Sequence, residues 1–285
     1  MLYLIGLGLG DEKDISVKGL ETVKKADFVF LESYTSLLGR DRESLSSFYG
    51  KDVLEADREF TEGAEEILSL AKNKNVAFLI VGDPFSATTH TDLVLRCKKE
   101  GIQVEVIHNA SILNAVGKCG LQLYKFGETV SLVFFTDTWK PDSFYDKIAR
   151  NRAAGLHTLC LLDIQMKEPN LESLVRGKVV YEAPRMITIS QAIQQLLFVE
   201  NSRKQQVFDK ETLLCVGLAR MGYPTECIAY GSLQQLADYD FGPPPHSLII
   251  PGQLHFLEAE HLELFNMSTR YRIGETKGCS KEYCQ

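Results

Sequence analysis

The first third of the chain alternates short apolar runs with stretches in which apolar residues recur every three to four positions. The apolar runs lie at residues 2–5, 28–31, 53–54, 76–81 and 104–107. Runs of this length are typical of strands that are buried on both faces, and the stretches between them have the period of amphipathic helices. This alternation predicts an α/β domain over residues 1–110, in which helices cover a largely parallel sheet.

Side chains that can cap helices precede two of the amphipathic stretches. Ser16 and Thr89 carry hydroxyl groups that can accept hydrogen bonds from the first turn of a helix. Each is followed by apolar residues at helical spacing, and residues 64–71 have the same spacing. We therefore expect one helix after Ser16, one over residues 64–71 and one after Thr89.

A second set of apolar runs begins after residue 111. Strand-like runs lie at residues 130–135, 157–162, 213–218 and 247–250, and helical patterns lie at 143–153 and 190–200. They predict a second α/β domain over residues 111–252. Residues 253–285 contain one amphipathic piece and then a polar, glycine-containing end. We expect them to form a partly disordered tail.

Charge and composition exclude several classes of protein. The net charge of −7 at pH 7 argues against direct binding to nucleic acid, because phosphate contacts require clustered Lys and Arg. The seven cysteines include no Cys-x-x-Cys pair, so their spacing indicates neither a disulfide framework nor a metal site. Residues 1–5 lack the basic start of a signal peptide, and no apolar run approaches the ~18 residues of a membrane span. We expect a cytoplasmic protein that does not contact a membrane.

Alternating glycines follow the first apolar run directly, in the sequence Gly6-Leu7-Gly8-Leu9-Gly10-Asp11. Glycine at the carboxyl end of a strand permits positive φ and a close approach of the backbone to a ligand. A dinucleotide-binding fingerprint requires Gly-x-Gly-x-x-Gly, but Asp11 stands at its last position and would face a pyrophosphate. Glu32 does match the acidic residue that holds a ribose, so an NAD-dependent dehydrogenase is the minority alternative. A phosphate-binding P-loop is weaker still, because the chain has no Gly-Lys-Ser or Gly-Lys-Thr.

Two further turns follow later apolar runs. The fourth run is followed by Gly82-Asp83-Pro84-Phe85-Ser86, in which Pro84 holds Asp83 in an extended conformation. The fifth run is followed by a polar turn at residues 109–111 that opens a helix. Open sheets bind ligands at the carboxyl ends of their strands. The three loops together predict a ligand-binding crevice, although the glycine turn by itself is better explained by backbone geometry alone.

At these loops the sequence resembles the tetrapyrrole-methylase-like (class III) methyltransferases, whose loops read Gly-x-Gly-x-Gly-Asp and Gly-Asp-Pro. Longer blocks within residues 1–252 narrow the resemblance to the diphthine synthase family; they lie at 1–10, 31–36, 81–90, 106–112, 120–127, 136–139, 157–164 and 245–249. The resemblance implies two α/β domains of the tetrapyrrole methylase type, with S-adenosyl-L-methionine in the cleft between them. It does not reach residues 253–285, so no function is expected of that tail.

The resemblance also implies which residues contact the cofactor. They are distributed over both predicted domains: Leu9, Asp83, Ser86, Ser111, Ile112, Leu162, Met221 and His246. Position 86 is often glycine in the family, so Ser86 is expected to use its backbone or to add a hydroxyl group. For Asp83 a ligand contact is favoured over a purely local turn role, because Asp83 belongs to one of a pair of pre-shaped loops.

The family's substrate is the histidine of translation elongation factor 2 that already carries a 3-amino-3-carboxypropyl group. Eukaryotic-type members methylate its amine three times and esterify its carboxylate to give diphthine methyl ester, releasing S-adenosyl-L-homocysteine. The resemblance further implies a homodimer through the second domain and a wide cleft that admits a loop of the protein substrate. Besides this enzyme, the dehydrogenase and a non-catalytic nucleotide-binding module stay open.

The chemistry of methyl transfer limits what the protein has to supply. Alignment of a nucleophile with the methyl carbon contributes roughly 7–11 kcal/mol. A carboxylate needs no base, whereas an amine must lose a proton before it attacks, and we hypothesise that water or a weak local base accepts this proton. His246, before the last apolar run, is the best histidine candidate, although a cofactor contact or a capping role is favoured for it. No residue is assigned as catalytic.

Overall fold

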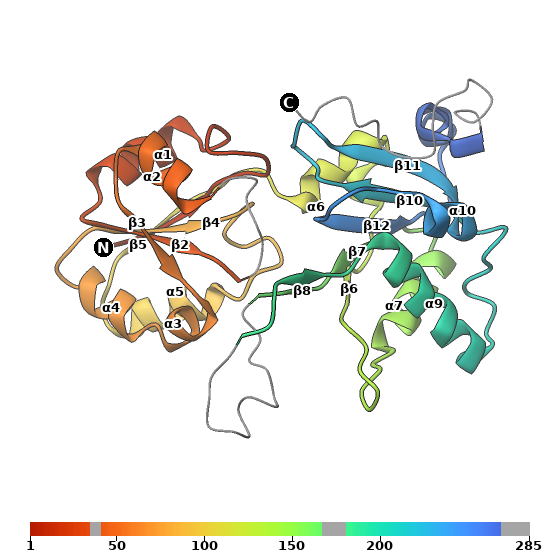
Figure 1. Cartoon of the computed structure of the whole chain (residues 1–285), viewed down its shortest axis with the longest axis horizontal. Helices are drawn as coiled ribbons and strands as arrows, with labels where there is room; N and C mark the ends of the chain where they lie inside the picture. Colours follow the sequence, from red (N-terminus) through yellow and green to blue (C-terminus); the bar gives the residue numbers. More distant parts are fainter. Residues whose placement is uncertain (35–40, 167–180, 269–285) are drawn as a thin grey trace. The chain divides into compact units, whose positions relative to one another are not determined.

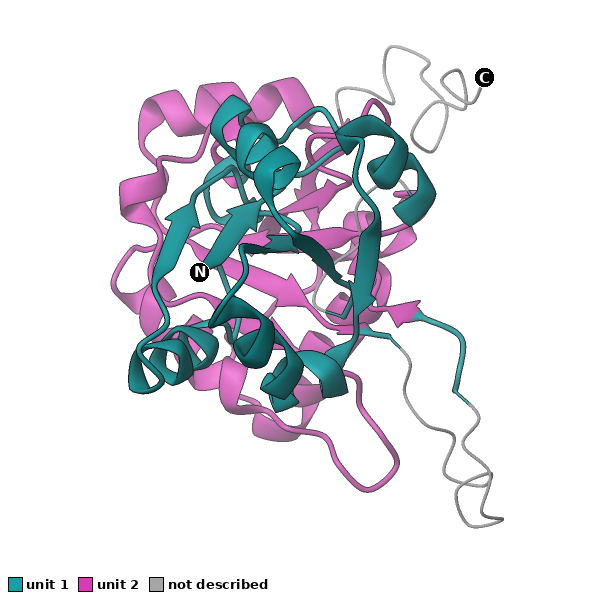
Figure 2. Cartoon of the chain, turned by 90° about the vertical axis from the view of Figure 1, so that its left-hand side faces the viewer, with its two compact units in different colours: residues 1–115, 165–184 teal, residues 116–164, 185–285 magenta. Residues whose placement is uncertain are grey.

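The computed structural model describes residues 1–34, 41–166 and 181–268. These residues form two compact units, which Figure 2 distinguishes by colour. Unit 1 comprises residues 1–115 and the described part of 165–184, and unit 2 comprises residues 116–164 and the described residues from 185 onward. The chain therefore leaves unit 1 between Ala115 and Val116, somewhat later than the boundary expected after residue 110, and it returns to unit 1 after Ile164.

Unit 1 contains a parallel sheet of five strands: β1 (Leu2–Gly6), β2 (Phe28–Glu32), β3 (Val53–Ala56), β4 (Val76–Ile80) and β5 (Val104–Ile107). The strand order is β3-β2-β4-β1-β5, and every neighbouring pair is parallel. The five strands expected from the apolar runs and their parallel arrangement are confirmed. Because all five strands run in one direction, the loops after them lie along one edge of the sheet.

The described helices of unit 1 are α1 (Val17–Lys25), α2 (Arg42–Tyr49), α3 (Arg58–Gly63), α4 (Glu65–Ala71), α5 (Thr91–Lys99) and α6 (Ile112–Ala115). Ser16 caps α1 as expected, since its hydroxyl oxygen accepts a hydrogen bond from Gly19 N at 3.1 Å. The capping role expected of Thr89 is wrong. His90 is the N-cap of α5 and makes no capping bond with its side chain, whereas the carbonyl oxygen of Thr89 accepts from Asp92 N.

Both faces of the sheet in unit 1 are buried. Along β4, Val76, Phe78 and Ile80 belong to one apolar cluster with residues of α4 and α5, while Ala77 and Leu79 belong to another with residues of α1 and α2. Figure 1 shows these two pairs of helices on opposite sides of the sheet. Burial on both faces explains why the strands are continuous apolar runs rather than alternating patterns.

Unit 2 contains a second sheet of five strands: β6 (Val130–Leu132), β7 (Thr158–Leu162), β10 (Leu214–Ala219), β11 (Cys227–Ser232) and β12 (His246–Ile250). The strand order is β11-β10-β12-β7-β6, with β6 and β7 parallel and the other pairs antiparallel. Four of these strands are expected from the sequence and β11 is not. A separate pair is formed by β8 (Ile164–Gln165) and β9 (Arg185–Met186).

The α-helices described in unit 2 are α7 (Ser143–Ala153), α9 (Ile189–Arg203), α10 (Leu233–Asp238) and α11 (Phe256–Leu262). Short 3-10 turns are η1 (Val116–Cys119), η2 (Leu123–Lys125) and η3 (Glu263–Phe265). A capping box starts α9: Gln191 N donates to Thr188 Oγ1 at 3.3 Å, and Thr188 N donates to Gln191 Oε1 at 2.9 Å. No helix in the described parts of the chain is both long and apolar enough to cross a membrane.

Residues 253–268 correct one expectation about the carboxyl-terminal segment. They carry α11 and η3, and Glu258, Leu262 and Met267 are buried in unit 2. This part of the segment is folded rather than a tail, because α11 brings a buried carboxylate and an apolar residue against the body of unit 2. The rest of the expected tail, residues 269–285, lies outside the described residues.

Candidate functional site

The loops after β1 and β4 are hydrogen-bonded to each other in unit 1. Gly8 N donates to Gly82 O at 3.2 Å, and Gly82 N donates to Gly8 O at 2.7 Å. Both glycines have positive φ, +79° and +80° respectively. Residues other than glycine rarely adopt this backbone conformation. The two glycine-containing loops are therefore joined into one surface at the carboxyl edge of the sheet.

Gly6 serves this close approach of the two loops. A Cβ atom at Gly6 would lie 2.6 Å from Gly82 O and 2.8 Å from Asn109 Cβ. Distances this short require movement of the backbone, so only glycine fits here. The sequence indicates that the glycines allow a ligand to approach the backbone. In the structure they also allow the loop after β1 to approach the loop after β4.

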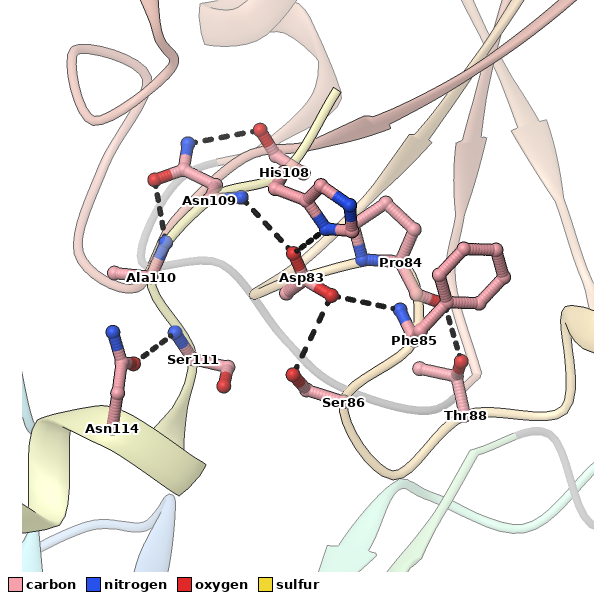
Figure 3. A network of polar contacts seen from close by, with 11 residues as sticks. Asp83, Pro84, Phe85, Ser86, Thr88, His108, Asn109, Ala110, Ser111 and Asn114 are labelled. Atoms are coloured by element: carbon pink, nitrogen blue, oxygen red, sulfur yellow. Dashed lines mark hydrogen bonds and ion pairs between the residues drawn. The ribbon is translucent and has the colours of Figure 1, made fainter. Parts of the chain in front are cut away.

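Asn109, at the start of the third loop, holds all three loops together (Figure 3). Its Nδ2 donates to Gly6 O and to Asp14 O, both at 2.9 Å, in the first loop region. Its backbone N donates to Asp83 Oδ2 in the second loop at 3.1 Å. Its Oδ1 accepts from Ala110 N at 2.7 Å. The side chain and the backbone N of this one residue together connect the loops that follow three strands.

Asp83 is the centre of the second loop. Its Oδ1 accepts from Phe85 N at 2.9 Å and from Ser86 Oγ at 3.5 Å. Its Oδ2 accepts from Asn109 N and lies 2.7 Å from His108 Nδ1. Burial alone would raise the pKa of this carboxyl group, but the hydrogen bonds from Phe85, His108 and Asn109 outweigh it and hold the pKa below its usual value. Asp83 is therefore ionised at neutral pH.

His108 is the partner of Asp83 that the sequence did not single out. It directly follows β5, and its side chain is 68% exposed although its Nδ1 is held by the carboxylate. The ring of Phe85 lies beside it, with 6.3 Å between the ring centroids, and Phe85 is itself 42% exposed. The pair forms an oriented imidazole beside an apolar ring at the edge of the sheet (Figure 3).

The remaining predicted residues of unit 1 lie on these same loops. Leu9 belongs to the first loop, and Ser86 belongs to the second, where its backbone N donates to Asp83 O at 3.2 Å. Ser111 and Ile112 open α6, and Ser111 N is capped by Asn114 Oδ1 at 2.8 Å. Ser111 is only 6% exposed. The structure thus brings the five predicted residues of unit 1 to one edge of its sheet.

The three predicted residues of unit 2 also lie at one edge of their sheet. Leu162 ends β7, His246 begins β12, and Met221 follows β10. Because β12 is antiparallel to both neighbours, the start of β12 lies beside the ends of β7 and β10. All three residues are at least nine-tenths buried.

His246 is buried and has one ring nitrogen engaged. Its Nδ1 accepts a hydrogen bond from Ile189 N at 3.3 Å, which is a backbone N–H that α9 cannot satisfy itself. Burial, and then the positive charge of Arg220, lower the pKa of His246 to about 4, while the nearby carbonyl groups of Pro243 and Gly242 act in the opposite direction. The neutral ring therefore carries its proton on Nε2, which is buried and has no hydrogen-bond partner in the described residues.

Arg220 organises the chain around Met221 and His246. Its guanidinium group is bonded to the carbonyl oxygens of Thr225, Phe241 and Pro243, and its backbone N donates to Pro245 O at 2.8 Å. The residue is 6% exposed and has a φ of +50°. A buried cation that is bonded to carbonyl groups holds the turn before β12 in place. The sequence offers no sign of this role, because the partners of the guanidinium group lie up to 23 positions away.

Within the described residues, no group of three or more His, Cys, Asp or Glu side chains is arranged to hold a metal ion. The side chains of Asp83, Asn109 and Arg220 are instead bonded to backbone groups or to other side chains. A ligand at either sheet edge would meet hydrogen-bonding groups and apolar side chains.

Comparisons with known proteins agree with this architecture. The family model of the tetrapyrrole (corrin/porphyrin) methylases matches residues 1–237. The diphthine methyl ester synthases of Mus musculus and Dictyostelium discoideum are 58% and 54% identical to this chain. Each alignment covers 94% of this chain, and they cover 97% and 98% of the two relatives.

Solved structures of similar proteins have the same fold. A crystal structure from Entamoeba histolytica, named as a candidate diphthine synthase, has a TM-score of 0.84 and 49% identity, and the match covers 93% of this chain and 98% of that chain. A crystal structure of a diphthine synthase has a TM-score of 0.79 and 35% identity, with 95% and 98% covered. The expected tetrapyrrole methylase fold is thereby confirmed. This chain belongs to the tetrapyrrole methylases and, among them, to the diphthine methyl ester synthase family.

Proposed function

We propose that this protein is an S-adenosyl-L-methionine-dependent methyltransferase of diphthamide biosynthesis. Its substrate is the aminocarboxypropyl-histidine of translation elongation factor 2, and its product is diphthine methyl ester. The observation that carries the proposal is the 54–58% identity to diphthine methyl ester synthases over nearly the whole chain. None of the relatives described above is a dehydrogenase, so that alternative has no support.

The residues at the two sheet edges fit this cofactor. The Nε2–H group of His246 is a buried donor without a partner in the described residues, and such a group is costly unless a ligand or water accepts from it. Leu162 and Met221 offer buried apolar side chains of the kind on which a purine ring packs. We propose that His246, Leu162 and Met221 contact the cofactor together with Leu9, Asp83, Ser86, Ser111 and Ile112.

Asp83 would act in this scheme mainly through the loop that it holds. Its two carboxylate oxygens already accept four hydrogen bonds, which is close to the capacity of a carboxylate. A direct bond from Asp83 to a cofactor hydroxyl would have to share one of these oxygens. Leu9 on the first loop and Ser86 on the second loop are half-buried, and we propose that they contact the cofactor through backbone atoms.

When bound, S-adenosyl-L-methionine supplies an electrophilic methyl group on a sulfonium. The protein has to align the acceptor with that group and to exclude water. The substrate carboxylate can attack directly, whereas the substrate amine must first be deprotonated. The same site therefore has to serve one acceptor that carries a proton and one that does not.

Mass spectrometry tests the proposed reaction. The protein is incubated with S-adenosyl-L-methionine and elongation factor 2 that carries the aminocarboxypropyl-histidine. A gain of four methyl groups is the expected result. A gain of three would restrict the reaction to the amine, and no gain would contradict the proposal. Calorimetric titration with NAD serves as the control, since tight NAD binding without a response to S-adenosyl-L-methionine would favour a dehydrogenase.

We further propose that the protein is a cytoplasmic homodimer that associates through unit 2. The cytoplasmic location follows from the proposed substrate, because elongation factor 2 acts in translation. Light scattering during size exclusion should give about twice the chain mass of 32.0 kDa. A mass of one chain at micromolar concentration would contradict the dimer and would leave the proposed reaction unaffected.

A further inference from the structure

Methylation of an amine releases a proton, and a group in the site or the solvent has to accept it. At neutral pH an aliphatic amine is mainly an ammonium ion, which has no lone pair for attack on a methyl carbon. Each of the three N-methylations therefore begins with the loss of one proton. Esterification of the carboxylate begins with no such loss. A proton acceptor in the site would thus be needed for N-methylation but not for esterification.

His246, the histidine that the sequence favours for this task, is unsuited to it. Its Nδ1 already accepts from Ile189 N, and its Nε2 carries the remaining proton of the neutral ring. Burial keeps the pKa at about 4, so the ring resists a second proton at neutral pH. His246 can donate to a ligand but cannot accept a proton from one.

Four other histidines are also poorly placed. His90 and His157 are 1% or less exposed, and burial lowers the pKa of both. His255 is the N-cap of α11, and His261 lies within that helix. Neither is at the strand ends that carry the proposed cofactor contacts. All six histidines of the chain lie in the described residues, and His108 is the one that remains.

His108 has the geometry of an oriented proton acceptor. Its Nδ1 lies 2.7 Å from Asp83 Oδ2, and Asp83 is an ionised carboxylate that can only accept. The ring proton must therefore lie on Nδ1, which leaves the lone pair on Nε2. The side chain is 68% exposed, so Nε2 is open to a substrate group. This arrangement of carboxylate, Nδ1–H and free Nε2 is the one that prepares an imidazole to act as a base.

The position of His108 in the fold supports the same role. It lies between β5 and Asn109, three residues before Ser111, on the loop that is tied to the other two. The exposed ring of Phe85 stands beside it and offers an apolar wall to the methylene groups of a substrate side chain.

We propose that His108 Nε2 accepts the proton that the substrate ammonium loses before each N-methylation. This inference rests on the proposed function. In each cycle the N–H bond breaks and the proton passes to Nε2. The amine lone pair then forms the N–C bond as the C–S bond breaks, and the sulfur keeps the electron pair of that bond. The imidazolium returns its proton to water before the next cycle.

His108→Asn tests this assignment with little disturbance of the loop. The Nδ2 of asparagine can occupy the place of the histidine Nδ1 and donate to Asp83, but nothing takes the place of Nε2. Two forms of elongation factor 2 serve as substrates: one carries the unmethylated aminocarboxypropyl group, and the other carries a trimethylated amine, so that only its carboxylate can react. Unchanged affinity for S-adenosyl-L-methionine and an unchanged melting temperature establish that the variant is folded.

The expected result is a split between the two substrates. N-methylation should slow by about 10²-fold, the lower range for loss of a general base, while esterification of the trimethylated substrate stays within about twofold of the wild type. Imidazole added to His108→Ala should restore part of the N-methylation only. Equal N-methylation rates in His108→Asn and wild type, or equal losses on both substrates, would overturn the assignment. Absence of methylation by the wild type would instead overturn the proposed function, and this inference with it.

Discussion

His246 is a residue with one satisfied and one unsatisfied ring nitrogen. Its Nδ1 accepts from the first backbone N–H of α9, and its Nε2–H is buried without a partner in the described residues. A buried donor that is left unpaired costs about 1–3 kcal/mol. A ligand that accepts from Nε2 would recover part of this cost, so His246 should contribute to affinity rather than to the chemical step.

The variant His246→Asn separates these functions. The Oδ1 of asparagine can accept from Ile189 N in place of Nδ1, while the donor at Nε2 is lost. We expect the Kd for S-adenosyl-L-methionine to rise about tenfold, equivalent to ~1.4 kcal/mol, with the ratio of N-methylation to esterification unchanged. Isothermal titration measures the first quantity and product analysis the second. An unaltered Kd would remove His246 from the proposed cofactor site.

The position of Asp83 could be predicted from the sequence, but its partners could not. Pro84 makes the preceding residue extended, and Gly82 marks the turn, so the carboxylate is expected at the end of β4. His108 and Asn109 reach it from the end of β5, 25 and 26 positions further along the chain. Sequence patterns show which strand ends share an edge, and they do not show which polar side chains meet there.

At the scale of structural elements, the loops after β1 and β4 depend on glycine for their contact. Gly8 and Gly82 exchange two backbone hydrogen bonds, and Gly6 leaves no room for a Cβ atom between Gly82 O and the Asn109 side chain. A methyl group in this place would separate the loops. It would also strain the bonds that Asn109 makes to the first loop.

Gly6→Ala should therefore weaken both the fold and the cofactor site. We expect a loss of about 1–3 kcal/mol in the free energy of unfolding, as for other overpacked positions, and a measurable rise in the Kd for S-adenosyl-L-methionine. Gly63→Ala is the matched control, because a Cβ atom there meets nothing within 4 Å. That variant should be neutral or slightly stabilising. Urea unfolding compares the two, and equal stabilities would contradict the packing argument.

The helix α11 is attached to unit 2 by a buried polar cluster. Glu258 Oε1 accepts from Gln122 N at 2.9 Å and lies 3.0 Å from His157 Nε2, and Glu258 Oε2 accepts from His255 N at 2.7 Å. Both Glu258 and His157 are at most 1% exposed. The contact joins positions that are 101 residues apart, which is why the sequence alone suggested a tail at this place.

Removal of the Glu258 carboxylate should be strongly destabilising. Glu258→Ala leaves the buried His157 ring and two backbone N–H groups without an acceptor, so we expect a loss of about 3 kcal/mol in unfolding free energy. Glu260→Ala, on an exposed position of the same helix, should stay within ~0.5 kcal/mol of the wild type. Denaturant titrations of both variants provide the measurement. A small effect of Glu258→Ala would mean that α11 is held by its apolar contacts instead.

Strands with strong apolar runs were predictable, and elements with mixed composition were not. The five strands of unit 1 are covered on both faces, so their runs stand out from the flanking residues. By contrast β11 contains Gly231 and Ser232 within a completely buried strand, and α3 carries mostly polar residues. Their structure comes from tertiary packing, which overrides local preference.

At the scale of the whole molecule, three buried histidines make the fold sensitive to acid. Burial lowers the pKa of His90 and of His246 to about 4, and it lowers the pKa of His157 as well. In the unfolded chain these groups have their ordinary value of 6.5. The stability that they contribute is complete above pH 6.5 and is lost as the pH falls toward the folded-state values.

The melting temperature should therefore fall steadily between pH 7 and pH 4. For His90 and His246, a shift from 6.5 to about 4 corresponds to ~3 kcal/mol each at pH 4. Calorimetric scans across this range measure the effect. His90→Leu, which removes one buried imidazole beside Phe78, should show a shallower dependence on pH. A melting temperature that stays constant from pH 7 to pH 5 would contradict this account.

The sequence predicted two domains, but it did not predict all of the residues that belong to each unit. Two successive sets of strands and helices indicate two domains, but the return of the chain to unit 1 after Ile164 leaves no mark in composition. The amphipathic piece within residues 253–285 indicates a helix, but it does not show that this helix packs against unit 2. Local periodicity reports on elements, whereas membership of a unit depends on contacts between distant parts of the chain.

The bonds made by Asn109 also bear on the thermodynamics of binding. Because that one residue joins the loops after β1, β4 and β5, the loops have little freedom left to lose when a ligand arrives. Ordering of flexible loops commonly diminishes the affinity that contacts provide. Here the loops are already ordered in the folded protein, so binding of a cofactor would not carry this entropic cost. Backbone amides of the three loops should accordingly resist hydrogen exchange to a similar degree before and after the ligand binds.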